Sequence, residues 1–471
     1  MAPRFQQGEL PYLAEGTGGI GFDENGEPVI TDQEELRFAL SIPLEQEMPP
    51  GGWPVVLYGH GTGGDFRSFI GAKVALTLAR AGIAVLSIDQ IHHAYRDKRP
   101  DGCHTTSDPA ACVSLVFFNF LVPAAGRDNV RQSALDFVSL LKVAQSFDMD
   151  LERRRRRTQM DSDPGDEAPP EEPAPAQDSG ISDAGLPLDA GAVADAGVSP
   201  DLGEVDAAVS PSDAGIADMD IVVGDGGVAD GGDLDMGEAD PDGQLPADAG
   251  MDEGVMEMRA RVKLDPQRVV YMGHSQGGLN GPLFLAVEPN VLGGVLSAAG
   301  AQLSVTLEQK TEPVDINDFV QQVVTFGADD TADRWHPVFG LLQTFIEPGD
   351  PVNYAGFWFK DVPEGYPHKH ILMTAGLNDE YTPPDSIFAL AAAGGVPIVE
   401  PVLREIELFE IMGIAPAGIP PYGGNVGGGE ASAGLIQLDN FGHFAIQRSN
   451  TLRNRYRRFI ESVMNGNASI Y

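Results

Sequence analysis

The chain has 471 residues, of which 42% are hydrophobic, so it is long enough to bury one large core or two ordinary ones. Its formal net charge of −40 would repel a polyanion, which argues against nucleic acid as a partner. No run of about 18 or more apolar residues is present, so the sequence predicts no transmembrane segment.

The first part of the chain alternates predicted strands and helices. Residues 53–58 form a short apolar run that ends at glycines, and helical spacing follows over residues 68–80. A second buried strand is expected over residues 82–89, and an amphipathic helix over residues 128–147. The spacing therefore predicts successive βα units.

Cys103 and Cys112 are the two cysteines of the chain, and they lie close together in a polar stretch. Their spacing allows a small disulfide-closed loop, which requires an oxidising compartment; two unpaired thiols are the alternative. Residues 1–7 lack the apolar core of a signal peptide. The sequence is thus compatible with a cytoplasmic protein, or with one whose numbering begins after a removed leader.

Five consecutive arginines, residues 153–157, precede a stretch of low complexity that holds much of the negative charge. Residues 161–258 contain 27 of the 70 acidic residues and no Lys, Arg or aromatic residue. The remaining 43 acidic and 30 basic residues give a net charge of −13, ordinary for an acidic enzyme. Because this stretch has little apolar bulk and its charges repel, we expect disorder. The arginines are either a solvated helix end or a docking site for these carboxylates.

After the acidic stretch the strand and helix pattern resumes. The expected elements are strands 268–272, 291–299, 370–375 and 434–438 and helices 276–287, 385–393 and 452–464. Repeated βα units predict an α/β fold with a doubly wound, mostly parallel sheet covered on both faces. We therefore expect one domain formed by residues 1–157 and 259–471, interrupted by a disordered acidic insertion at residues 158–258.

Ser275 is the predicted nucleophile. It is the central residue of Gly-His-Ser-Gln-Gly at residues 273–277, between an apolar strand and a helix. A serine on such a sharp turn projects its hydroxyl above the sheet, and small neighbours let strand and helix approach closely. A glycine-rich turn with an exposed serine is the alternative.

The base that activates the serine is expected among nine histidines. His443 is favoured because it follows the last strand and precedes the closing helix, where a loop can aim imidazole at Ser275. His92 and His93, which follow a strand at the same edge of the sheet, are the alternatives.

The orienting acid should lie between nucleophile and base along the chain. Asp379 follows a strand and is favoured, with Glu380 and Asp385 as nearby alternatives. An ionised carboxylate there would fix the imidazole tautomer and stabilise the imidazolium formed during attack.

Two backbone N–H donors are needed for the developing oxyanion. One is expected at Gln276, directly after the nucleophile. The other is expected in the glycine-rich turn of residues 60–64, at Thr62 or, as second choice, Gly61. A phosphate-binding loop is a poorer fit, because no Lys-Ser or Lys-Thr closes the turn.

These motifs, in this order, resemble the α/β-hydrolase superfamily over about residues 35–464 apart from the insertion. Residues 58–64 and 127–133 look like the secreted bacterial lipases of the virulence-factor lipase group. The resemblance implies hydrolysis of small-molecule, lipid or polymer esters through an acyl-enzyme, without a metal or other cofactor, outside the cytoplasm. A peptidase or thioesterase on this fold, or an inactive surface or spacer protein, remains an alternative.

Segments 113–121 and 339–359 are rich in apolar and aromatic residues and are expected to form a lid, an acyl pocket or ordinary core. The residues expected to line the substrate pocket are His60, Gly61, His92, His274 and Phe118.

Overall fold

The computed structural model describes residues 1–96, 109–150, 219–222, 261–324, 327, 333 and 335–471. These residues belong to one compact unit, and residues 152–215, which form a second unit, lie wholly outside them. The predicted disorder of the insertion and the predicted role of residues 153–157 therefore fall outside the described residues, except at residues 219–222.

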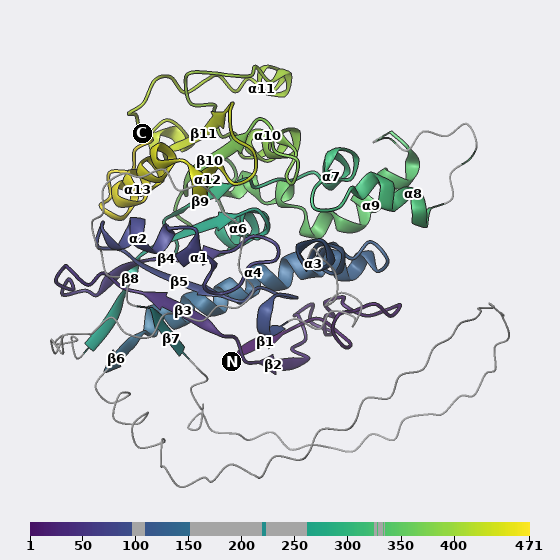
Figure 1. Cartoon of the computed structure of the whole chain (residues 1–471), viewed down its shortest axis with the longest axis horizontal. Coiled ribbons are helices and arrows are strands. Elements are labelled where there is room, and N and C mark those ends of the chain that lie inside the picture. Colours follow the sequence, from purple (N-terminus) through teal and green to yellow (C-terminus); the bar gives the residue numbers. More distant parts are fainter. Residues whose placement is uncertain (97–108, 151–218, 223–260, 325–326, 328–332, 334) are drawn as a thin grey trace, which may run out of the picture. The chain divides into compact units, whose positions relative to one another are not determined.

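A central sheet organises the described residues (Figure 1). Its strands are parallel except that β3 runs antiparallel to β5 and β6 antiparallel to β8. In spatial order they are β11 (Ala433–Leu438), β10 (His370–Gly376), β9 (Gly293–Ser297), β8 (Arg261–His274), β4 (Trp53–Gly59), β5 (Ala84–Ile88), β3 (Phe38–Ser41) and β7 (Met219–Val222), with β6 (Asp148–Asp150) beside β8. A separate antiparallel pair joins β1 (Ala2–Arg4) to β2 (Asp32–Glu34).

Alternate residues of each central strand enter two different cores, as the pleat of a strand requires. Leu57 and Tyr271 face α4 (Pro123–Ser146), α6 (Gln276–Val287) and α10 (Pro384–Gly394). Val56 and Val270 face the opposite layer, formed by α1 (Ser68–Gly71), α2 (Val74–Ala79), α12 (Ala445–Arg448) and α13 (Asn450–Met464). Because both faces are covered, the strands are continuously apolar. The predicted α/β-hydrolase fold with a doubly wound, mostly parallel sheet is confirmed.

Two predicted helices differ from those observed. The helix expected over residues 68–80 is broken into α1 and α2, because Lys73 has a left-handed backbone with φ 61°. The helix expected from residue 128 begins earlier, at Pro123, since proline suits the first helical position, where its missing N–H costs nothing.

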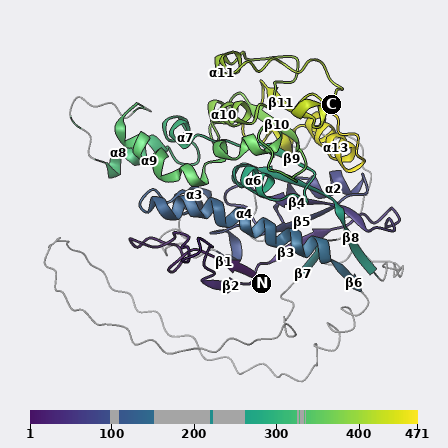
Figure 2. The same ribbon diagram turned by 180° about the vertical axis from the view of Figure 1, so that it is seen from behind.

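A group of short helices covers the carboxyl edge of the sheet beside α3 (Pro109–Phe118). These cap helices are α7 (Leu303–Gln309), α8 (Ile316–Val323) and α9 (Pro337–Ile346), and they lie together in both views (Figures 1 and 2). Their apolar faces form a small core of Leu303, Leu307, Ile316, Val320, Phe339 and Ile346. Phe120, at the end of α3, packs against Phe319 of α8 with ring centroids 6.1 Å apart. The remaining short elements are α11 (Glu407–Ile411) and the 3-10 turns Ala94–Arg96, Glu347–Gly349, Pro351–Asn353, Ala355–Trp358 and Gly427–Gly429.

The residues flanking the acidic insertion lie at the amino end of β8. Asp150, before it, pairs with Arg261, after it, in the β6–β8 ladder. Ser275 follows the other end of the 14-residue strand β8. Asp150 and Arg261, the described residues nearest the insertion, therefore lie at the opposite end of β8 from Ser275.

Within the predicted disordered insertion, residues Met219–Val222 form the edge strand β7 beside β3. Ile221 and Val222 favour extended backbone, and β3 presents a free edge whose backbone groups accept a further strand.

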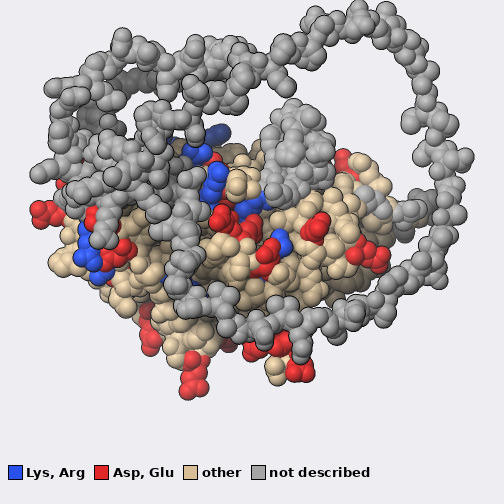
Figure 3. Space-filling model, turned by 90° about the horizontal axis from the view of Figure 1, so that it is seen from below, with Lys and Arg blue, Asp and Glu red and all other residues tan. Residues whose placement is uncertain are grey.

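Charges of both signs occur on the described part of the surface seen in Figure 3, with acidic side chains spread between basic ones. Among the described residues, no single helix has the length and hydropathy needed to cross a membrane, although α3 and α4, bent by 103° at their junction, meet that test as a pair.

Candidate active site

Ser275 occupies the turn that joins β8 to α6. Its backbone has φ 55° and ψ −118°, a conformation that residues other than glycine rarely adopt. A Cβ added to Gly277 would lie 2.1 Å from the Gly59 oxygen, and one added to Gly273 would lie 2.3 Å from the Gly277 oxygen. Only glycine therefore allows β4, β8 and α6 to converge at this turn.

Hydrogen bonds hold the turn in this strained conformation. The Ser275 amide donates to the Ser297 carbonyl over 2.9 Å, and the Gly277 amide donates to the His60 carbonyl over 3.0 Å. The Tyr271 hydroxyl donates to the Gly277 carbonyl over 2.6 Å. Three neighbouring segments thus fix the serine in place.

His443 and Asp379 form a buried pair at the carboxyl edge of the sheet. The His443 Nδ1 lies 3.0 Å from each Asp379 carboxylate oxygen. Asp379 Oδ1 also accepts the amides of Tyr381 and Thr382 over 2.9 and 2.8 Å. Because the carboxylate accepts, Nδ1 carries the proton, which leaves Nε2 as the basic nitrogen.

Aromatic rings fix the orientation of His443. Tyr381 stacks on it with ring centroids 4.8 Å apart, and His274 packs at the same distance. Phe444 meets it edge-on at 5.0 Å. His274 immediately precedes Ser275, so this packing places the His443 imidazole near the Ser275 turn.

The alternative acids and bases lie elsewhere. Glu380 is exposed, and Asp385 pairs with Arg404 over 2.8 Å. His92 Nε2 lies 3.2 Å from the Asn129 amide oxygen, and His93 Nδ1 donates to the Ile91 carbonyl. Of the residues considered from the sequence, Asp379 and His443 are the acid and base that the structure brings together.

Two backbone amides are available as oxyanion donors. Within the described part of the chain, neither the Thr62 nor the Gln276 N–H donates a hydrogen bond. The Thr62 hydroxyl donates to the Gln276 side-chain oxygen over 3.0 Å, which ties residues 60–64, hereafter the oxyanion loop, to the start of α6. A Cβ on Gly61 would lie 3.2 Å from the Ser275 Cβ, so this loop passes directly beside the nucleophile.

The ring of His60, the first residue of the oxyanion loop, is held by two hydrogen bonds. Its Nδ1 donates to the Gly61 carbonyl over 2.9 Å, and its Nε2 accepts the Gln90 amide over 3.2 Å. The ring is therefore neutral, and complete burial lowers the pKa of His60 to about 4. Burial also holds the pKa of His93 and of His274 well below the usual value.

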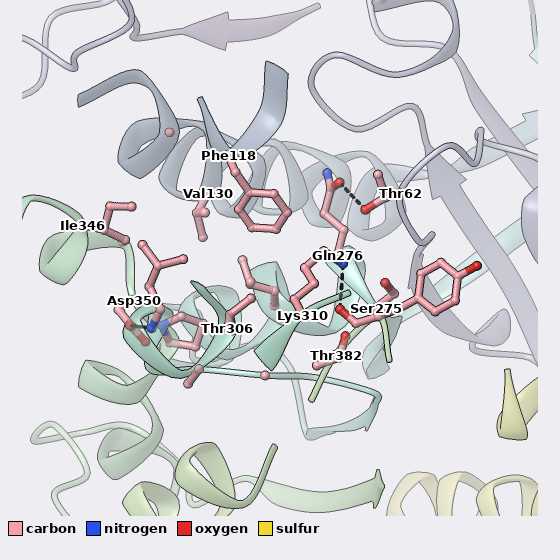
Figure 4. Close-up of a pocket in the computed structure, with 18 residues that line it drawn as sticks. Thr62, Phe118, Val130, Ser275, Gln276, Thr306, Lys310, Ile346, Asp350 and Thr382 are labelled. Atoms are coloured by element: carbon pink, nitrogen blue, oxygen red, sulfur yellow. Dashed lines mark hydrogen bonds between the residues drawn. The ribbon is translucent and has the colours of Figure 1, made fainter. Parts of the chain in front are cut away.

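A pocket of about 720 Å³, which includes space open to solvent, lies beside Ser275 (Figure 4). Phe118 and Val130 line it from α3 and α4, and Ile346 lines it from α9. Thr62 and Gln276 lie near Ser275 in Figure 4. The pocket is largely apolar and opens onto the serine.

Several residues expected at the pocket are not among those that line it. The His60 ring is buried against the Gln90 amide, the His92 ring against Asn129, and the His274 ring against His443, so each ring is held by protein partners rather than facing open space. Gly61 lies beside Ser275 but is also absent from the lining. Phe118 does line the pocket.

Each of the two segments rich in aromatic residues, 113–121 and 339–359, contributes some residues to the pocket lining and others to the hydrophobic cores. In residues 339–359, Ile346, Gly349, Asp350 and Pro351 line the pocket, while Phe339, Trp358 and Phe359 are buried in the cores. In residues 113–121, Phe118 lines the pocket and Phe117 is buried.

Sequence reasoning missed Lys310 and Asp350, which also line the pocket. Asp350 accepts the amides of Gln302 and Leu303 and so begins α7. A lone charged residue at the end of a short helix is typical of a solvated surface, so neither position carried a signal in the sequence.

Cys112 is one half of a disulfide. Cys103 lies outside the described residues, so its predicted pairing with Cys112 stays a prediction. Within the described ranges, no three His, Cys, Asp or Glu side chains are grouped so as to hold a metal ion.

No protein-family model and no curated protein matches the sequence. Among solved structures, the chain is similar to an acetyl xylan esterase from Paenibacillus sp. R4, with a TM-score of 0.40, 14% identity, and coverage of 88% of this chain and 76% of that one. Acetyl xylan esterase 1 from Thermoanaerobacterium sp. JW/SL YS485 gives a TM-score of 0.41, 12% identity and the same coverages. Est1E from Butyrivibrio proteoclasticus gives a TM-score of 0.34 and 10% identity, with coverage of 91% of this chain and 94% of that one. Likenesses this weak support no inference about chemistry, and the fold rests on the strand order described above.

Proposed function

We propose that this protein is a serine hydrolase that cleaves carboxylic esters through an acyl-enzyme, with Ser275, His443 and Asp379 as its catalytic residues. The observation that carries the proposal is the strained Ser275 turn beside the oriented His443–Asp379 pair. Strain of this kind costs about 1–3 kcal/mol and persists where the surrounding structure enforces it.

The reaction follows from the geometry. The Ser275 hydroxyl oxygen attacks the ester carbonyl carbon while His443 Nε2 takes the hydroxyl proton. The negative charge that develops on the carbonyl oxygen accepts the Thr62 and Gln276 amides, and the positive end of the α6 dipole adds to their field.

Collapse of this intermediate breaks the bond to the leaving alcohol, which takes the proton from His443 and leaves an acyl group on Ser275. Water then repeats the sequence with His443 as base and releases the carboxylic acid. No cofactor enters these steps.

The apolar pocket suits the acyl part of the ester. Phe118, Val130 and Ile346 would contact hydrocarbon, and burying each CH₂ contributes about 0.8 kcal/mol. Lipids, short acyl esters and polyesters all present such groups. A p-nitrophenyl ester series from acetate to palmitate separates these classes by the chain length of highest kcat/KM.

We also propose that the protein works outside the cytoplasm. The disulfide at Cys112 supports this, since disulfides persist in oxidising compartments.

The experiment that tests the proposal is Ser275→Ala combined with labelling by a fluorophosphonate probe. The variant should keep the circular dichroism spectrum of the wild type and lose both labelling and p-nitrophenyl ester turnover. Ser146→Ala, an exposed serine at the end of α4, is the matched control and should retain both. Turnover retained by Ser275→Ala would refute the proposal, and absence of labelling in the wild type would favour an inactive protein.

Parallel assays with peptide p-nitroanilides and acyl thioesters distinguish an esterase from a peptidase or thioesterase, because all three share the same catalytic residues. The proposal expects the highest kcat/KM for oxygen esters.

A further inference from the structure

Lys310 is the one basic side chain among the described residues that line the pocket. It directly follows α7, and Thr306, one helical turn earlier, lines the pocket from the same side of the helix. Lys310 is only 6% exposed. In Figure 4 it lies between Thr306 and Ser275.

The Lys310 ammonium has hydrogen-bonding capacity that the protein does not use. Of its three N–H groups, one donates to the Glu312 carbonyl over 2.5 Å and one to the Tyr381 carbonyl over 2.7 Å. No ion pair of Lys310 occurs among the described residues. Two neutral carbonyls and the Tyr381 ring, whose centroid lies 5.6 Å from Nζ, therefore surround the buried cation, and one of its N–H groups has no hydrogen-bond acceptor among the described residues.

The carboxylates of Asp379 and Asp350 accept hydrogen bonds from groups other than Lys310. Asp379 binds His443 and two backbone amides. Asp350 accepts the Gln302, Leu303 and Val352 amides and the Gln343 side chain. Burial lowers the pKa of Lys310 to about 8, although the negative charges of Asp379 and Glu312 act in the opposite direction.

A buried charge without a counter-charge is costly, and an incoming anion removes that cost. We propose that Lys310 forms an anion subsite in the pocket and that the preferred substrates carry a carboxylate in addition to the ester bond. The spare N–H would donate to this carboxylate while Ser275 attacks the ester. This inference rests on the proposed esterase function and narrows its substrate class.

The carboxylate could belong to either side of the ester. Monoethyl esters of malonic, succinic, glutaric and adipic acid place it on the acyl side at increasing distance. Butyryl esters of glycolate and 3-hydroxypropionate place it on the alcohol side. Ethyl butyrate and ethyl hexanoate are neutral references of similar length.

The measurement is the ratio of kcat/KM for an anionic ester to that for its neutral reference, both on the same enzyme. If a substitution of Lys310 displaces Tyr381, kcat/KM falls equally for both esters, and this loss cancels in the ratio. We expect at least one anionic ester to be preferred about tenfold, the effect of a charge-assisted hydrogen bond. Lys310→Met and Lys310→Gln should each remove that preference, mainly by raising KM.

Lys369→Met is the matched control. Lys369 is also a buried lysine that binds backbone carbonyls, those of Glu288, Pro289 and Val291, but it does not line the pocket. Its replacement should leave the ratio unchanged.

Two outcomes overturn the subsite. One is hydrolysis of neutral esters with no preference for any anionic ester. The other is an equal loss of kcat for both ester types in the Lys310 variants, which would make Lys310 a support of Tyr381 alone. Failure to hydrolyse any ester would instead refute the proposed function.

Discussion

Ser275 has a strained backbone at a position that a less strained residue could occupy. Glycine would relieve the strain at φ 55°, yet the chain places a serine there and holds it with backbone hydrogen bonds. This strained position is consistent with the proposed role of the Ser275 hydroxyl as the nucleophile. Beside it, Asp379 restricts His443 to the tautomer with a free Nε2.

Replacing Asp379 by Asn should lower kcat by about four orders of magnitude, because an amide can donate to Nδ1, favours the wrong tautomer and cannot stabilise the imidazolium. Steady-state kinetics on a p-nitrophenyl ester measure this loss. The control is Glu380→Gln, which removes an adjacent but exposed carboxylate. Equal effects of the two substitutions would mean that Asp379 does not orient the base.

Two strands and a helix converge at Ser275, and they do so by backbone contact. Gly59 of β4 and Gly277 of α6 lie so close that no Cβ fits between them. The cap helices supply the other wall of the pocket, where Asp350 fixes the start of α7 and Lys310 follows its end.

Gly277→Ala should therefore lower the free energy of unfolding by about 1–3 kcal/mol, because its methyl group would overlap the Gly59 carbonyl. Denaturant titration provides the measurement. In Gly71→Ala, at the end of α1, the added Cβ meets nothing within 4 Å, so this variant should match or exceed the wild type. Two variants of equal stability would contradict the close approach of β4 and α6.

Across the whole molecule, buried neutral histidines link stability to pH. His60, His93 and His274 all have a lowered pKa because burial disfavours the imidazolium. Their unfolded forms bind protons near pH 6.5, whereas folded His60 does so only near pH 4. The contribution of these histidines to the free energy of unfolding is therefore fully present above pH 6.5 and is lost as the pH falls toward 4.

For His60 alone this decline amounts to about 3 kcal/mol. The carboxyls of Asp89 and Asp136, whose pKa values burial raises, act in the opposite direction, so a variant is needed to isolate the histidine. Between pH 6.5 and 4 the free energy of unfolding of His60→Gln should change less with pH than that of the wild type. Parallel pH dependences would show that His60 is not buried and neutral.

The sequence by itself determined the parallel sheet and the catalytic candidates, because both depend on local pattern. Short continuous apolar runs, glycines around Ser275, and polar residues directly after strands are readable without contacts. They placed Asp379 and His443 after β10 and β11, whose carboxyl ends meet at one edge of the sheet.

Only the tertiary structure decided what surrounds those residues. The burial of His60 against Gln90 and of His92 against Asn129, and the position of Lys310 at the pocket, depend on contacts between segments far apart in sequence. A local pattern records the periodicity of one segment, whereas a pocket is the space left when several segments pack, and no single segment encodes it.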